Sequence, residues 1–69
     1  MEFKITPRLG EILKERGLTQ TQLSEMSGVT QGSISRFDKN SRHDDAHLFA
    51  ISHALGIKIE ELFRVETVE

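Results

Sequence analysis

The segment TQTQLSEMSGVTQGSISRF constrains the fold of this chain more than any other part of its sequence. Thr19 and Gln22 have the spacing of a capping box, in which each side chain accepts a hydrogen bond from the other residue's backbone N–H at a helix start. Gly28 has the place of a helix-ending glycine, and Thr30 then caps a new helix. The segment therefore predicts two short helices joined by a tight glycine turn. Their expected bounds are about 20–27 and 31–38.

The rest of the chain predicts a mainly α domain with one small sheet. Thr6 followed by Pro7 is typical of a helix start, and Asp44 or Asp45 can cap a later helix. The sequences EFKI and FRVETV place apolar residues at every second position, so we expect these terminal segments to pair as strands. The expected elements outside the central pair are helices over about 7–16, 46–55 and 59–63 and strands over about 2–5 and 63–68. With five helices and a two-stranded sheet, the 69 residues make one small domain.

The second helix of the central pair has an outward face suited to reading DNA. Two helices joined by a glycine turn form a helix-turn-helix, which places its second helix in the major groove. We expect Leu23 and Met26 of the first helix, and Ile34 and Phe37 of the second, to face the core. The outward side chains are then small or able to hydrogen-bond, and glutamine, serine and arginine are residues that contact bases. The expected base-reading residues are Gln31, Gly32, Ser33 and Arg36.

The charge of the chain is unevenly distributed. The formal net charge of −2 argues mildly against a nucleic-acid partner. The segment 31–43 nevertheless carries Arg36, Lys39 and Arg42 against one acid, Asp38, whereas acids gather later, at Glu60, Glu61, Glu66 and Glu69. Helix starts and basic flanks are where phosphates bind. The expected phosphate-binding residues are Thr19, Gln20, Thr30, Ser35, Lys39, Ser41 and Arg42.

The stretch LTQTQLSEMSGVTQGSISRFDKN, with LFAISHALGIKIEELF after it, resembles the Cro/C1-type (Xre) family of lambda-repressor-like regulators. The resemblance covers nearly the whole chain, and its matching positions are Gln20, Ser24, Gly28, Ile34 and the ALG of residues 54–56. It implies a lambda-repressor-like bundle of five helices. It also implies base contacts at Gln31, Gly32 and Arg36 and phosphate contacts at Gln20, Lys39 and Arg42. The terminal strands resemble those of a subgroup of very short members.

The sequence departs from the family pattern in three places, two of which, HDDAH and Gly32, bear on affinity and sequence preference. Phe37 and Asp38 stand where the family often has Trp or Leu followed by Glu, a change that we expect to alter only packing. The sequence HDDAH, residues 43–47, puts two acids where a basic loop is expected. Gly32 replaces a side chain that commonly reads a base. Two explanations of Gly32 stay open: neutral drift at a surface position, or close approach of the helix backbone to DNA.

Catalysis and metal binding are not expected. HDDAH imitates the two histidines of a zinc protease, but His43 precedes the expected helix and the acid is the shorter aspartate. The chain has no cysteine, so thiolate metal sites and disulfides are excluded. No nucleophile has a recognisable base, and we expect no cofactor.

These observations predict a sequence-specific regulator that binds double-stranded DNA, most simply a repressor of bacterial, phage or plasmid origin that occupies its operator. Because one short helix offers few base contacts, we expect a homodimer on a two-fold symmetric operator. The expected dimer interface comprises Phe49, His53, Ile57, Phe63, Val65 and Val68. The alternative is a protein-interaction module, such as an antitoxin or antirepressor. We expect no small-molecule effector, no membrane partner and a cytoplasmic location, since the sequence shows no signal peptide and no long apolar run.

Overall fold

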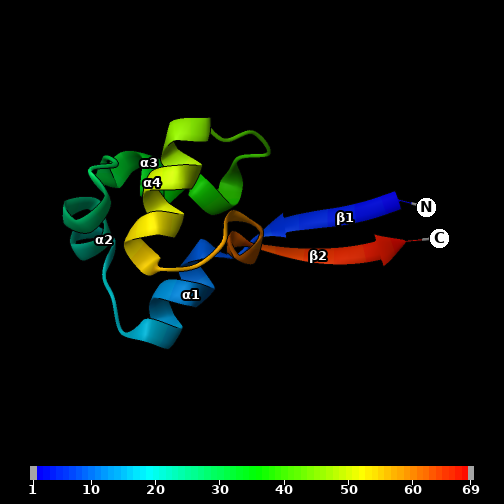
Figure 1. The fold of residues 1–69 in the computed structure, drawn as a ribbon, viewed down its shortest axis with the longest axis horizontal. Coiled ribbons are helices and arrows are strands. Elements are labelled where there is room, and N and C mark those ends of the chain that lie inside the picture. Colours follow the sequence, from blue (N-terminus) through cyan, green and yellow to red (C-terminus); the bar gives the residue numbers. More distant parts are fainter. Residues whose placement is uncertain (1, 69) are drawn as a thin grey trace.

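A helical body carries a two-stranded antiparallel ribbon that projects from the side opposite α2 (Figure 1). The computed structural model describes residues 2–68, so Glu69 of the acidic tail lies outside the described residues. The elements in chain order are β1 (Glu2–Pro7), α1 (Leu9–Arg16), α2 (Gln20–Ser27), α3 (Gln31–Arg36), the 3-10 turn η1 (Phe37–Lys39), α4 (Asp45–Leu55), the 3-10 turn η2 (Ile59–Leu62) and β2 (Phe63–Val68).

The predicted starts of both central helices, and the predicted end of the first, are confirmed. Thr19 Oγ1 accepts from Gln22 N at 3.1 Å, and Gln22 Oε1 accepts from Thr19 N at 2.8 Å, which completes the capping box. Gly28 ends α2 with a φ of 78°, a left-handed conformation that favours glycine. Thr30 Oγ1 accepts from Ser33 N at 3.3 Å and caps α3. The glycine turn between α2 and α3 is therefore fixed at both of its ends.

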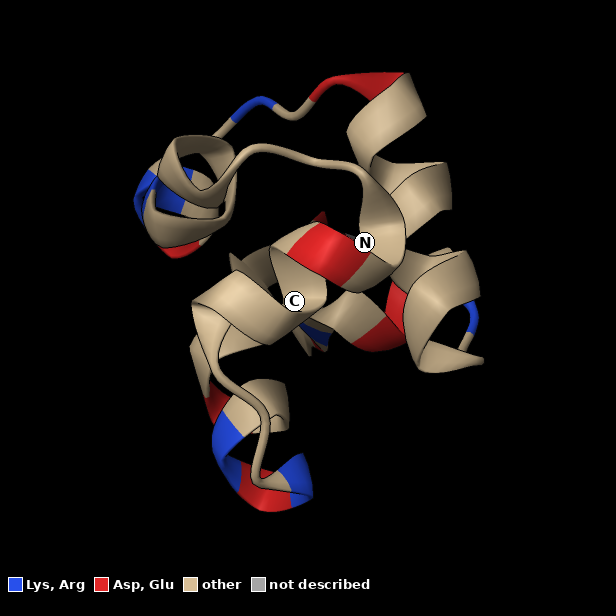
Figure 2. Ribbon diagram, turned by 90° about the vertical axis from the view of Figure 1, so that its left-hand side faces the viewer, with Lys and Arg blue, Asp and Glu red and all other residues tan. Residues whose placement is uncertain are grey.

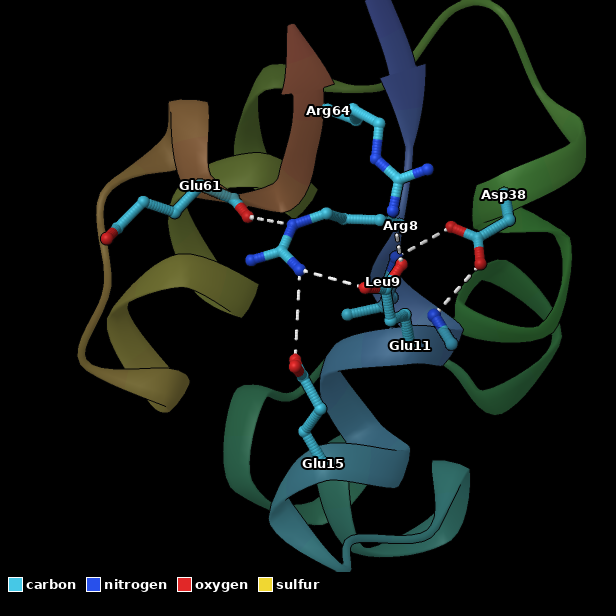
Figure 3. Close-up of polar contacts among 8 residues, drawn as sticks. Arg8, Leu9, Glu11, Glu15, Asp38, Glu61 and Arg64 are labelled. Atoms are coloured by element: carbon cyan, nitrogen blue, oxygen red, sulfur yellow. Dashed lines mark hydrogen bonds and ion pairs between the residues drawn. The ribbon is translucent and has the colours of Figure 1, made fainter.

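The prediction that Thr6 and Pro7 begin the first helix is wrong. Both residues belong to β1, where Thr6 pairs with Arg64, and α1 begins only at Leu9. The cap of α1 comes from far along the chain: Asp38 Oδ1 accepts from Leu9 N at 2.8 Å and Asp38 Oδ2 from Gly10 N at 2.9 Å (Figure 3). Because a remote carboxylate satisfies the first N–H groups, α1 needs no local cap.

The count of five helices is also not what the structure shows. The reading helix is α-helical only to Arg36 and continues as the turn η1. The expected last helix is the 3-10 turn η2. The Glu61 side chain caps its start, because Oε2 accepts from Lys58 N at 2.7 Å. Since Phe63 already pairs with Pro7 in the ribbon, only four residues remain for η2, and a 3-10 turn suits such a short piece. Residues 2–68 thus contain four α-helices, and α4 is capped by Asp44.

The core lies between the four helices and the two 3-10 turns. Its buried hydrophobic residues are Leu9, Ile12, Leu13, Leu23, Val29, Ile34, Phe37, Ile51, Leu55 and Leu62. The prediction that Met26 faces this core is wrong, because Met26 is 51% exposed. Val29 from the turn is a core residue, at 4% exposed, and its carbonyl accepts from Ser24 Oγ at 2.6 Å. Ser24 is half-buried, and Met26 lies on the exposed flank of α2.

The ribbon is held to the body by a polar cluster at its base (Figure 3). Arg8 Nε donates to the Glu61 carbonyl at 3.2 Å, and the same guanidinium lies 3.5 Å from Glu11 and 3.7 Å from Glu15. Arg64 of β2 donates to Glu11 Oε2 at 3.1 Å. These exposed ion pairs are individually weak, but together they fix the direction in which the ribbon leaves the body.

Candidate nucleic-acid interface

Two buried side chains set the orientation of α3. Ile34 and Phe37 are each 3% exposed, so one side of the helix is held firmly against the core. At about 100° per residue, the opposite side must face solvent. Gln31, Gly32, Ser35 and Arg36 are all exposed. The structure therefore brings three of the four expected base-reading residues, and Ser35, to one open surface.

The fourth expected base-reading residue, Ser33, lies differently. It is half-buried, and its hydroxyl oxygen accepts from the Thr30 hydroxyl at 2.9 Å. Since the Ser33 backbone N–H also donates to Thr30 Oγ1, both groups of Ser33 take part in the cap of α3. Ser33 therefore stands at the edge of the outward face, next to the helix start.

Gly32 and Arg36 form one unit on the outward face. A methyl group added at the Gly32 α-carbon would lie 3.5 Å from Arg36 Nη1 and 3.6 Å from Nη2. The guanidinium thus folds back along the helix and covers Gly32, in the direction that long helical side chains favour. A residue larger than alanine at position 32 would occupy the place of this guanidinium. A glycine or an alanine at position 32 therefore leaves room for Arg36 to lie over this part of α3.

The start of α2 offers a second set of expected contacts. Thr19 and Gln20 are exposed, as is Thr30 at the start of α3. The Thr19 and Thr30 hydroxyl oxygens already accept from backbone N–H groups, so each hydroxyl is held in one place. Helix starts attract anions through free N–H groups and the helix dipole. Both helix starts are thus open to solvent, as the expected phosphate contacts require.

The polar residues 38–42 that follow Phe37 are exposed. Lys39, Ser41 and Arg42 are all open to solvent. Asp38, the only acid among them, is engaged by two N–H groups of α1, so its charge partly offsets that helix's dipole. In Figure 2 a short tan stretch separates the blue of the loop before α4 from the red start of α4, where Asp44 and Asp45 lie. Cations and acids thus adjoin on this side of the molecule.

A shallow pocket of about 190 Å³ separates α3 from the start of α4. Its polar lining comprises Ser33, Arg36, Asn40, Arg42, His43, Asp44 and His47. His43 Nε2 donates to the Phe37 carbonyl at 2.7 Å, and its ring lies 4.1 Å from the Phe37 ring, between centroids. His43 is thus part of the packing beneath the pocket. Among the described residues, no group of three or more histidine, aspartate or glutamate side chains is placed to hold a metal ion.

The expected dimer residues lie in two environments. Phe49, His53, Val65 and Val68 are exposed, with Phe49 65% open to solvent. Ile57 and Phe63 are half-buried and pack against the core, and the Phe63 ring is 5.8 Å from that of Phe37. Phe3 and Ile5 were not expected in this set, although they are 62% and 60% exposed. The alternation of Phe3 and Ile5 with charged residues in EFKI could have indicated that both lie on one exposed face of the strand.

The role of Asp38 was also missed. Asp38 was expected to alter only packing, whereas its carboxylate joins the end of the reading segment to the start of α1. A cap that acts between residues about 29 positions apart leaves no local pattern in the sequence. The aspartate just after the reading helix was the only sequence feature that hinted at this remote cap.

Together, a capped helix, a glycine turn and a second short helix with a hydrogen-bonding outward face define a helix-turn-helix DNA-binding domain. The family comparison agrees, because a helix-turn-helix family model matches residues 9–62. The chain belongs to this family, the Cro/C1-type (Xre) helix-turn-helix regulators. The matched residues include neither strand of the ribbon.

Further comparisons add no relatives. Neither the curated proteins nor the solved structures contain a match to this chain. Within residues 2–68, no helix has the length and apolar character needed to cross a membrane.

Proposed function

We propose that this DNA-binding regulator is a repressor that occupies a two-fold symmetric operator as a homodimer. The observation that carries the proposal is the outward face of α3, where Gln31, Gly32 and Arg36 are exposed while the opposite side is anchored in the core. Glutamine reads adenine and arginine reads guanine in the major groove. A helix with this face is suited to recognise a specific sequence.

Affinity in this proposal comes from the flanking cations and helix starts. Lys39, Ser41 and Arg42 follow the reading helix and contact the phosphate backbone, together with Ser35 and the residues at the two helix starts. These contacts position α3 in the groove and carry no sequence information of their own. Binding is therefore expected to weaken steeply as salt is raised.

The homodimer follows from the number of contacts. A few base contacts, each worth about 1–3 kcal/mol, rarely distinguish one site from the rest of a genome. A two-fold dimer doubles them and reads two half-sites. The interface is drawn from Phe49, His53, Ile57, Phe63 and Val65 of the expected set, whereas Val68 pairs with Glu2 on the opposite face of the ribbon from Val65 and is left out. Repression by occupancy needs no effector, and we propose none. A bacterial or phage origin and a cytoplasmic location accompany this proposal.

Selection from a randomised pool of double-stranded oligonucleotides tests the proposal. We expect one enriched two-fold symmetric sequence, bound with a salt slope of about −0.9 per phosphate contacted. Arg36→Ala should relax the preference at one base pair, whereas Lys39→Ala or Arg42→Ala should weaken binding to all sequences. Lys14→Ala, which removes an exposed cation from α1, is the matched control and should change neither. A pool with no enriched sequence contradicts the proposal.

One observation favours a second function. Asp44 and Asp45 adjoin the basic segment at the start of α4, and Glu60 and Glu61 are exposed in η2. An antitoxin or antirepressor would use such acids to bind a basic partner protein. In that case the same selection would yield no sequence, and retained binding would show little dependence on Arg36.

A further inference from the structure

The ribbon of β1 and β2 has an apolar face that no part of the chain within residues 2–68 covers. Phe3 and Ile5 are 62% and 60% exposed, and Val65 is 50% exposed. Ile5 pairs directly with Val65, and opposed residues of an antiparallel pair share a face. At the base of the ribbon this face runs into Phe63, which packs on Phe37. The apolar surface is thus an extension of the core that ends in solvent.

The other face of the ribbon is of a different character. Its residues are Glu2, Lys4, Thr6, Arg64, Glu66 and Val68. Lys4 is paired directly with Glu66, so opposite charges adjoin across the strands. An isolated two-stranded ribbon is marginally stable in water, and it gains stability when an apolar face is covered. The alternation therefore gives the ribbon one face for water and one face for burial.

We propose that a second copy of this chain covers the apolar face, with the two ribbons packed face to face about a two-fold axis. The inference rests on the proposed function only in that it names the surface that forms the proposed dimer. The apolar face carries no charged side chain, which disfavours nucleic acid and any partner recognised by its charge. The same face on a second copy meets this requirement and brings no like-charge repulsion.

The pairing is self-complementary. With the two ribbons antiparallel, Ile5 and Val65 of one copy meet Ile5 and Val65 of the partner near the axis. Phe3, near the free end of the ribbon, then reaches the base of the partner ribbon, where Phe63 and Phe37 form an aromatic cluster. Each copy thus supplies both the projecting ring and the surface that receives it.

The dimensions agree with a DNA-binding dimer. The molecule is 40 Å in its longest extent, and six residues of strand span about 20 Å. If the ribbons overlap fully, the helical bodies lie at opposite ends, with centres on the order of 40 Å apart, near the roughly 34–36 Å between half-sites one helical turn apart. Phe3, Ile5 and Val65 together expose on the order of 300 Å² per copy, less than a standard interface buries. The free dimer is therefore weak and is strengthened when DNA holds both copies.

Two valines of β2 give a matched test, because Val65 lies on the apolar face and Val68 on the charged face of the same strand. Sedimentation equilibrium of the full chain without DNA, at micromolar to submillimolar concentration, should show a monomer–dimer equilibrium. Val65→Lys should raise the dissociation constant of the dimer by about 30-fold or more, whereas Val68→Lys should leave it within about threefold. A wild-type chain that stays monomeric throughout, or equal effects of both lysines, overturns the proposal.

Single cysteines keep the test decisive if Val65→Lys does not fold. The chain has no cysteine, so Ile5→Cys and Lys4→Cys each introduce one thiol, on opposite faces of the ribbon. Under mild oxidation Ile5→Cys should form a disulfide-linked dimer at least about tenfold faster than Lys4→Cys, because only residue 5 lies near the axis. Equal cross-linking rates overturn the proposal.

The two proposals fail in distinguishable ways. If DNA selection yields no sequence but Ile5→Cys cross-links selectively, the dimer surface stands without the regulator function. If the selected operator is bound while the ribbon variants behave like wild type, the regulator stands and the ribbon is not its interface. Under both proposals, Val65→Lys should still bind an isolated half-site as a monomer and lose its preference for the two-fold site.

Discussion

Replacing Asp38 with alanine should destabilise the protein more than any other change at an exposed acid. The carboxylate accepts from Leu9 N at 2.8 Å and from Gly10 N at 2.9 Å, so it acts as the cap of α1 from the end of the reading segment. Loss of an ordinary side-chain cap costs about 1 kcal/mol. Here two charge-assisted hydrogen bonds disappear at once, and partial exposure lets water compensate for some of the loss.

We therefore expect Asp38→Ala to lower the free energy of unfolding by about 2 kcal/mol. This is a large fraction of the total for a domain of 69 residues, and it corresponds to a fall in Tm of about 8–16 °C. Urea and thermal unfolding, followed by far-ultraviolet circular dichroism, measure both quantities.

Two further variants separate the cap from a loss of charge. Asp38→Asn keeps one acceptor oxygen and should lose about half as much stability. Glu25→Ala removes an exposed acid from α2, and we expect its stability to change by less than about 0.5 kcal/mol. If Asp38→Ala is also within about 0.5 kcal/mol of wild type, the carboxylate does not stabilise α1, and the account of its cap is refuted.

Three other substitutions test the reading helix and its turn. Gly32→Ala should raise the free energy of unfolding by about 0.5 kcal/mol in urea, because the added methyl meets only the Arg36 guanidinium at ordinary distance. Gly10→Ala is the control: its methyl would lie 3.1 Å from Asp38 Oδ2, so it should raise the free energy of unfolding by less. Gly32→Glu should fold and yet lose operator binding in a gel shift, since it displaces Arg36 and adds an anion to the outward face; normal binding would show that α3 does not enter the groove as proposed. Ser24→Ala should cost about 1 kcal/mol of unfolding free energy by leaving the Val29 carbonyl without its donor, and an unchanged Tm would contradict this.

The sequence was most informative where structure is determined locally. The capping box at Thr19 and Gln22, the glycine turn at Gly28 and the cap at Thr30 depend on neighbours within a few residues, and all were predictable. The outward face of α3 followed from the same helical periodicity. The pairing of the two ends was predictable in kind because both show alternation, although β1 runs two residues further than expected.

Prediction failed where distant segments decide between local alternatives. Pro7 is suited to both a helix start and an edge strand, and pairing with Phe63 selects the strand. Met26 has the spacing of a core residue but is 51% exposed, whereas Val29 from the turn belongs to the core. The hydrogen bonds between Asp38 and the start of α1 form only once η1 and α1 are packed together. The sequence also could not show why residue 32 is a glycine, because the position of the Arg36 guanidinium over Gly32 depends on the folded helix.

The ribbon also has a consequence for the order in which the protein folds. It joins the two ends of the described chain, with Glu2 opposite Val68, so its contacts have the greatest sequence separation in the molecule. Closing so long a loop has a high entropy cost, and such contacts form late. The helical body can fold first from segments that are close in sequence, and β1 then pairs with β2 in the last step. Amide hydrogens of β1 and β2 should accordingly exchange faster than those of α2 and α4, and become slower at high protein concentration.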